Sequence, residues 1–145
     1  MLIAEFIATF CSGTFFGAAV YISLAQHPAT LEAGPGVGGR FFPPMYRRAA
    51  PMQILLAVVG TLAGVIIWGL GGTLLWLIGA IFLVSVIPIT LVAIKPINDV
   101  LLDPTHSPDA SDTESLLKRW GPKHWARSIV SGTSFVLFLI AYAGA

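Results

Sequence analysis

The segment KRWGPKHWARS, residues 118–128, holds residue types that could do chemistry. His124 and Arg127 are three residues apart, so on a helix they share one face. A histidine titrates near neutral pH and can act as a general base. An arginine, together with an amide such as Asn98, can hold a developing oxyanion. The structural alternatives are an interface anchor for the 118–128 segment and a helix C-cap for Asn98.

Further candidates lie in the segment before the second apolar run. Tyr46 and Trp120 could stack on a planar molecule, because aromatic rings pack well on flat apolar faces. Arg47 belongs to the basic stretch RFFPPMYRR, which could equally anchor the chain at lipid phosphates. His27 directly follows the first apolar run, where the helix dipole also favours a histidine.

The composition indicates a membrane protein. The chain has 145 residues, of which 56% are hydrophobic and 10% are charged, whereas a soluble domain typically carries about 25% charged residues. The net charge of +1 and the lack of a long basic run argue against nucleic-acid binding. The sequence has no HExxH pattern, and its one cysteine, Cys11, lies within an apolar run. We therefore expect no metal site and no internal disulfide.

Apolar runs predict four membrane spans within a single domain, residues 1–145. Each run is near the length of about 20 residues that crosses a bilayer. We place the spans at about 2–26, 51–69, 73–94 and 122–143. Because the connection between the second and third spans is very short, the fold class is an all-α, up-down four-helix bundle.

The charges predict the orientation of this bundle. All eight Lys and Arg lie in or beside the links 27–50 and 95–121. The positive-inside rule therefore puts both long links in the cytoplasm and both termini outside, most simply in the plasma (inner) membrane.

Local signals give finer expectations for the links. The first link is expected to be an ordered but irregular loop. In the second link, Ser111 and Glu114 form a capping-box pattern that predicts a short interfacial helix. Gly121-Pro122 should end that helix before the last span, and Pro88 should kink the third span.

Small residues predict where the helices approach closely. Gly13 and Gly17, like Gly60 and Gly64, have the spacing that lets helix backbones pack against each other. We expect these glycines to face other helices of the bundle. The same spacing leaves a homo-oligomer open.

Two separated motifs resemble the signature of a known membrane family. KPINDVLL and LLKRWGPKHWARS match a pattern carried by Pro96, Asn98, Leu101 or Leu102, Trp120, His124 and Arg127. Together with MYRRAAP they resemble the DUF1772, or anthrone-oxygenase-like, family over most of the chain. The family often shows a second asparagine where Asp99 stands here. Its characterised fungal members are implicated in oxidising polyketide anthrones to anthraquinones.

The resemblance implies a cofactor-independent oxygenase acting on a hydrophobic aromatic (anthrone-like) or quinol-like substrate. His124 would be the base, with Arg127 and Asn98 holding the oxyanion. Trp120, Tyr46, Arg47 and His27 would contact the substrate. We expect the side chains of His124 and Arg127 to converge near Asn98 around a cavity of a few hundred Å³, as is usual for small-molecule sites. The partners are then the lipid bilayer and a hydrophobic small molecule.

Two other functions stay open from the sequence. The chain could be a non-enzymatic membrane accessory or lipid-binding protein, in which the Trp/His/Arg cluster only anchors the last span. As a lesser alternative, His27 and His124 could be axial ligands of a haem. No haem-binding motif supports this last reading.

Overall fold

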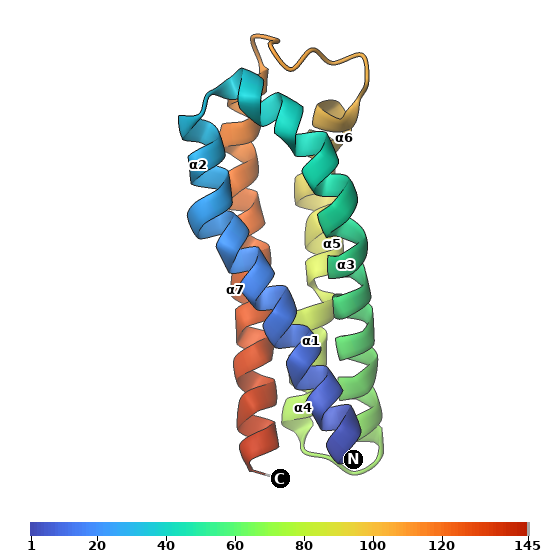
Figure 1. Cartoon of the computed structure of the whole chain (residues 1–145). Helices are drawn as coiled ribbons and strands as arrows, with labels where there is room; N and C mark the ends of the chain where they lie inside the picture. The colour runs from blue at the N-terminus through green and yellow to red at the C-terminus, as the bar shows by residue number, and fades with distance from the viewer. Residues whose placement is uncertain (145) are drawn as a thin grey trace.

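The computed structural model describes residues 1–144, and the regular secondary structure of this part of the chain is all helical, without strands (Figure 1). Four stretches are long and apolar enough to cross a membrane: Leu2–Glu32, Pro35–Gly69, Leu74–Leu102 and Thr113–Ala143. The all-α, four-span prediction is confirmed. Within these stretches the elements are α1 (Leu2–Tyr21), η1 (Ile22–Gln26), α2 (His27–Glu32), α3 (Pro35–Gly69), α4 (Leu74–Val84), α5 (Val86–Ile89), η2 (Thr90–Ile94), α6 (Lys95–Leu102) and α7 (Thr113–Ala143).

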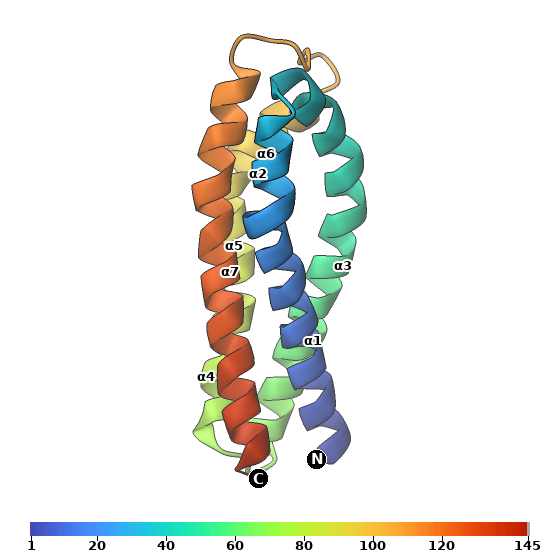
Figure 2. The same cartoon turned by 60° about the vertical axis from the view of Figure 1, so that its left-hand side comes forward.

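The four stretches run antiparallel, so that both termini and the α3–α4 link lie at one end of the bundle (Figure 1). Gly71 lets the α3–α4 link turn sharply, because its φ of +93° is readily adopted only by glycine. The other two links lie at the opposite end, which carries the lysines and most arginines; we call it the basic end. Figure 2 shows α1 beside α7 and α3, and α4 also packs on both α7 and α3.

The core of the bundle is built around large rings set against small residues. Trp76 and Phe138 are almost completely buried, with ring centroids 5.2 Å apart. The Phe138 ring packs directly on Gly64 and Gly79, where an added Cβ would come within 2.9 and 2.5 Å of it. These two glycines therefore make the room that the aromatic core needs.

The glycine predictions are confirmed at three positions and wrong at one. Gly13 packs on the Phe135 ring, Gly60 lies between Cys11 and Leu83, and Gly64 packs on Phe138. An added Cβ on Gly17, however, would meet nothing within 4 Å.

The reason is that the contact between α1 and α7 changes partners. Gly13 of α1 packs on the Phe135 ring of α7. About one turn further along α1 the roles are reversed, and the Phe16 ring of α1 packs on Gly132 of α7. The contact thus advances by three residues rather than four, which turns Gly17 away from α7.

The links are more helical than predicted. The first link is not an irregular loop, because α2 and α3 leave only Ala33 and Gly34 between them. Pro35 suits the first turn of α3, and Pro43, Pro44 and Pro51 are accommodated inside that helix.

The second link also differs from its prediction. α7 runs unbroken from Thr113 through Gly121-Pro122 to Ala143, so no separate short helix ends there. Its N-cap is Asp112 rather than Ser111, and no side chain caps it. Pro122 is exposed, and losing one backbone hydrogen bond does not interrupt so long a helix.

The third span is interrupted close to Pro88, where the sequence predicts a kink. α4 ends at Val84, the residue whose carbonyl the Pro88 ring would crowd, and Ser85 interrupts the helix. The π-helical segment η2 follows and ends just before Pro96.

Candidate functional site

Arg127 points into the bundle, on the side of α7 that faces α3. Its Nη2 donates a hydrogen bond to Oε1 of Gln53 at 2.6 Å, and its guanidinium lies 5.3 Å from the centre of the Phe15 ring. Arg127 lies about 24 Å along α7 from Ala143 at 1.5 Å per residue, which is within an apolar layer about 30 Å thick. An inward cation at this depth needs a partner or a ligand.

No carboxylate supplies that partner among residues 1–144. Asp99, the acid next to Asn98, is exposed and pairs instead with Lys95 at 2.7 Å. Arg127 therefore keeps its charge beside an amide and a ring face, a combination suited to receiving an anionic or strongly polar oxygen.

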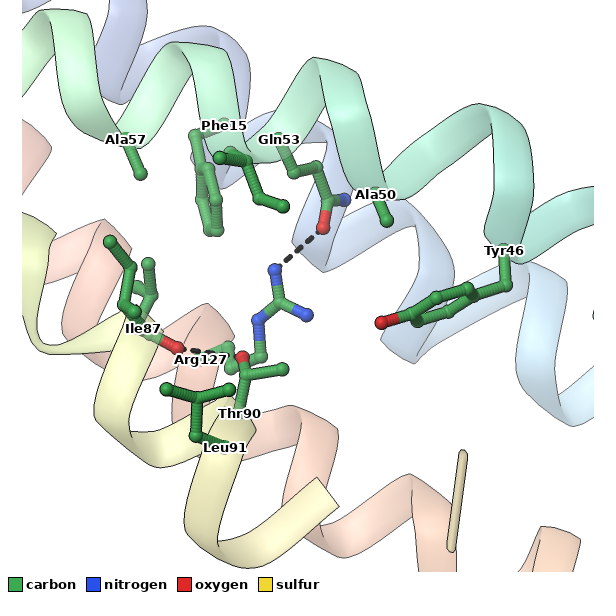
Figure 3. A pocket seen from close by; sticks show the side chains of 11 residues that line it. Phe15, Tyr46, Ala50, Gln53, Ala57, Ile87, Thr90, Leu91 and Arg127 are labelled. Carbon is green, nitrogen blue, oxygen red and sulfur yellow. Dashed lines mark hydrogen bonds between the residues drawn. The ribbon is translucent and has the colours of Figure 1, made fainter. Parts of the chain in front are cut away.

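A cavity of about 130 Å³ opens beside the guanidinium (Figure 3). Most of its wall is apolar and comes from α3, α5 and η2, with Phe15 from α1. Figure 3 shows the hydroxyl of Tyr46 pointing across the cavity toward Arg127. The lining residues are Phe15, Tyr46, Ala50, Gln53, Ile54, Ala57, Val86, Ile87, Thr90, Leu91 and Arg127. This arrangement fits a flat apolar molecule that carries an oxygen at one edge.

A second group of predicted residues gathers around Trp120, nearer the basic end. The indole stacks on His124 with ring centroids 4.5 Å apart, and its Nε1 donates a 2.9 Å hydrogen bond to Oδ1 of Asn98. His27 and Phe42 contact the same indole, at 5.1 and 5.7 Å between centroids. Asn98 is thus not a helix cap, but it is already bonded within the protein.

His124 belongs to this Trp120 cluster and does not line the Arg127 cavity. Its side chain is 1% exposed, and Nδ1 lies 3.0 Å from Oγ of Ser23. Ser23 in turn lies 3.0 Å from the hydroxyl of Ser128. This short chain of hydrogen bonds joins α7 to η1 and fixes the orientation of the imidazole.

The predicted site residues are therefore divided. Arg127 and Tyr46 share the cavity, whereas His124, Asn98, Trp120 and His27 share the neighbouring cluster. The single cavity expected between His124 and Asn98 is not what the structure has. Arg47 is exposed on α3 and lines neither group.

Sequence reasoning missed Gln53, which holds the guanidinium. The sequence did carry a signal for Gln53, because it is the lone amide in an apolar run. A polar side chain inside a membrane span is energetically costly unless it has a structural or functional role. Ser23 carried no comparable signal. Across residues 1–144, no three His, Cys, Asp or Glu side chains gather in a way that could hold a metal ion.

Comparison with known proteins gives one match. The family model described as Anthrone oxygenase matches residues 42–137, which include Tyr46, Gln53, Asn98, Trp120, His124 and Arg127. No curated protein and no solved structure matches the chain.

Proposed function

The chain belongs to the anthrone oxygenase family, and from this premise we propose that it oxygenates a hydrophobic aromatic or quinol-like substrate in the cavity beside Arg127. One observation carries the proposal: Arg127 faces an apolar cavity inside the membrane layer without a carboxylate partner. A purely structural arginine in that position would be expected to pair with an acid or to extend toward the headgroups.

The chemistry follows from what a buried guanidinium does to an enolisable substrate. In an anthrone, loss of a proton from the CH₂ group leaves an enolate whose charge lies largely on oxygen. Arg127 would stabilise that oxyanion, and stabilisation of developing charge is a large term in catalysis. The enolate carbon then gives electrons to dioxygen and forms a hydroperoxide. Loss of water leaves C=O where CH₂ stood, so one dioxygen yields one ketone and one water.

Two other polar residues of the cavity, Gln53 and Tyr46, take part in this scheme. Gln53 holds the guanidinium through its side-chain oxygen. Tyr46, whose hydroxyl points toward Arg127, is the ionisable group placed to exchange a proton with the bound substrate (Figure 3). His124 does not line the cavity, so we assign it, with Asn98 and Trp120, to positioning α7 rather than to contact with the substrate.

The other functions predict different results. An accessory or lipid-binding protein would hold a hydrophobic molecule and leave it unchanged. A haem held by His27 and His124 would need Trp120 to move, because both imidazoles pack on that indole. Absorption spectroscopy of the purified protein tests the haem directly, since bound haem gives a Soret band.

We also propose the orientation in the membrane. With the lysines and arginines at or near the basic end, the positive-inside rule puts that end in the cytoplasm and both termini outside, in the plasma (inner) membrane. The cavity would then lie closer to the cytoplasmic face, and its substrate would arrive from the bilayer.

The test is oxidation of anthrone by the purified protein in nanodiscs. Dioxygen uptake and anthraquinone absorbance are followed together, against the rate with empty nanodiscs. We expect Arg127→Met to lower kcat/KM by about 100-fold, the usual effect of losing an oxyanion donor. Arg127→Lys should retain part of the rate.

Arg119→Met is the matched control, because Arg119 lies on the same helix but is exposed. It should behave like the unmodified protein. An unmodified protein no faster than empty nanodiscs, or an Arg127→Met variant with full activity, would refute the proposed function.

A further inference from the structure

The Arg127 cavity offers more hydrogen-bond donors than acceptors. A guanidinium can only donate, so Gln53 must turn its oxygen toward Arg127 and its NH₂ group away from it. Gln53 is 4% exposed, and within residues 1–144 neither its Nε2 nor Nε of Arg127 has a hydrogen-bond partner. Buried donors are normally satisfied. An acceptor oxygen brought by a ligand would satisfy them after a small rotation of either side chain, since neither atom is open to the cavity as it stands.

The size of the cavity limits how much of that ligand fits inside. Its volume is about 130 Å³, and a dry cavity of about 150 Å³ holds one benzene-sized molecule. The enclosed part of the ligand is therefore about one ring, with its oxygen at the Arg127–Gln53 end.

The part of the ligand outside the cavity would pass between α3 and the third span. The α3 backbone approaches the third span closely mainly at α4 and α6, and much less where α3 passes α5 and η2, which leaves a window there. Ile54 and Leu91 line both the cavity and this window, and they are 57% and 56% exposed. At this depth the window faces lipid, so whatever passes through it must be apolar.

We infer that the cavity binds the ring of a one-ring quinol or quinone that carries an alkyl tail, with Arg127 and Gln53 on one ring oxygen. The tail leaves through the window between α3 and η2 and lies among the lipid chains. This inference rests on the proposed function in taking the Arg127 cavity as the substrate site. A rigid three-ring molecule fits less well, because about one ring fills the cavity.

The experiment measures binding to the full chain in nanodiscs by calorimetry. The probes are a benzoquinone with a ten-carbon chain, the same ring without a chain, and anthraquinone. We expect the tailed quinone to bind at least 10-fold more tightly than anthraquinone. Gln53→Leu removes the donor and releases Arg127, and should weaken binding about 10-fold.

A matched pair of variants separates binding in the cavity from dissolution in the bilayer. Ala50→Phe fills part of the cavity and should weaken binding by a similar factor, whereas Ala49→Phe, on the same helix but outside the cavity, should not. Circular dichroism checks that each variant is folded. Should Gln53→Leu fail to fold, the Ala50 and Ala49 pair and the three probes still decide the question.

The outcomes are distinct from those of the oxygenase assay. Tighter binding of anthraquinone, or equal binding by the Ala50→Phe and Ala49→Phe variants, overturns the inference. Anthrone oxidation without quinone binding does the same, yet leaves the proposed function standing. Cavity-dependent quinone binding without dioxygen uptake supports the inference and counts against the oxygenase.

Discussion

The hydrogen bond between Trp120 and Asn98 joins α7 to α6 beside the candidate site, and its strength can be measured. Trp120 is 4% exposed and Asn98 2% exposed, with 2.9 Å between Nε1 and Oδ1. Trp120→Phe leaves the Asn98 amide without its partner, and Asn98→Leu leaves the indole N–H without one. Each substitution should destabilise the fold by about 1–3 kcal/mol, because each leaves a buried polar group unpaired.

The double variant removes both partners, so its cost should be smaller than the sum of the single costs. Hydrogen bonds between membrane helices contribute about 0.6 kcal/mol on average and about 1.7 kcal/mol at most. We expect a coupling energy of about 1–1.7 kcal/mol here, since both groups are almost completely buried. Unfolding in mixed micelles with increasing SDS, followed by far-UV circular dichroism, gives the four free energies that the cycle needs.

Trp125→Phe is the control for this cycle. Trp125 lies on the same helix, is 37% exposed and makes no side-chain hydrogen bond within residues 1–144, so it should not couple to Asn98. A Trp120–Asn98 coupling below about 0.3 kcal/mol, within the usual error of additivity, would mean that the bond contributes nothing and that only ring packing holds the cluster.

Two further predictions concern the bundle and its orientation. Gly13→Ala should destabilise the protein by about 1–3 kcal/mol, because the Phe135 ring, 2.8 Å from the added Cβ, must move; Gly17→Ala meets open space and should stabilise it by about 0.5–1 kcal/mol through helix propensity. The same SDS titration compares them, and equal effects would contradict the α1–α7 packing. A cysteine at Ala110 should react with an impermeant thiol reagent only after the cells are opened, whereas a tag at either terminus should be accessible in intact cells; the reverse pattern would invert the proposed orientation.

The sequence predicted the number of spans and the helix ends opposite the basic end, but not the helix ends at the basic end, for one physical reason. Apolar length reports where lipid surrounds a helix, and all four runs are long enough to be unambiguous. It does not report where the helix stops. α3 begins at Pro35, well before the apolar run that starts near Pro51, because its first turns pack on neighbouring protein. Gly38, for example, lies against Leu117 of α7.

The candidate site was predictable in its inward arginine but not in its grouping. Arg127 needs a partner because it points into the bundle, and Gln53 accepts a hydrogen bond from it. Residues three apart, however, differ by about 60° around a helix with 3.6 residues per turn. In a bundle this angle is enough for His124 to meet Ser23 from the first span while Arg127 meets Gln53 on the second. Which neighbour each side chain meets depends on packing, which a single sequence does not contain.

The two π-helical segments, η1 and η2, restrict where residues can be inserted into or deleted from this chain. Each ends at the residue before a His-Pro or Lys-Pro pair: Ile22–Gln26 before His27-Pro28, and Thr90–Ile94 before Lys95-Pro96. A π segment amounts to one extra residue in an α-helix. Removing that residue would turn everything beyond it by about 100°, and would take His27 or Asn98 away from Trp120. The Trp120 cluster thus depends on two single-residue insertions, one in the first span and one in the third. The length of these segments is therefore as important to the cluster as the residues that they contain.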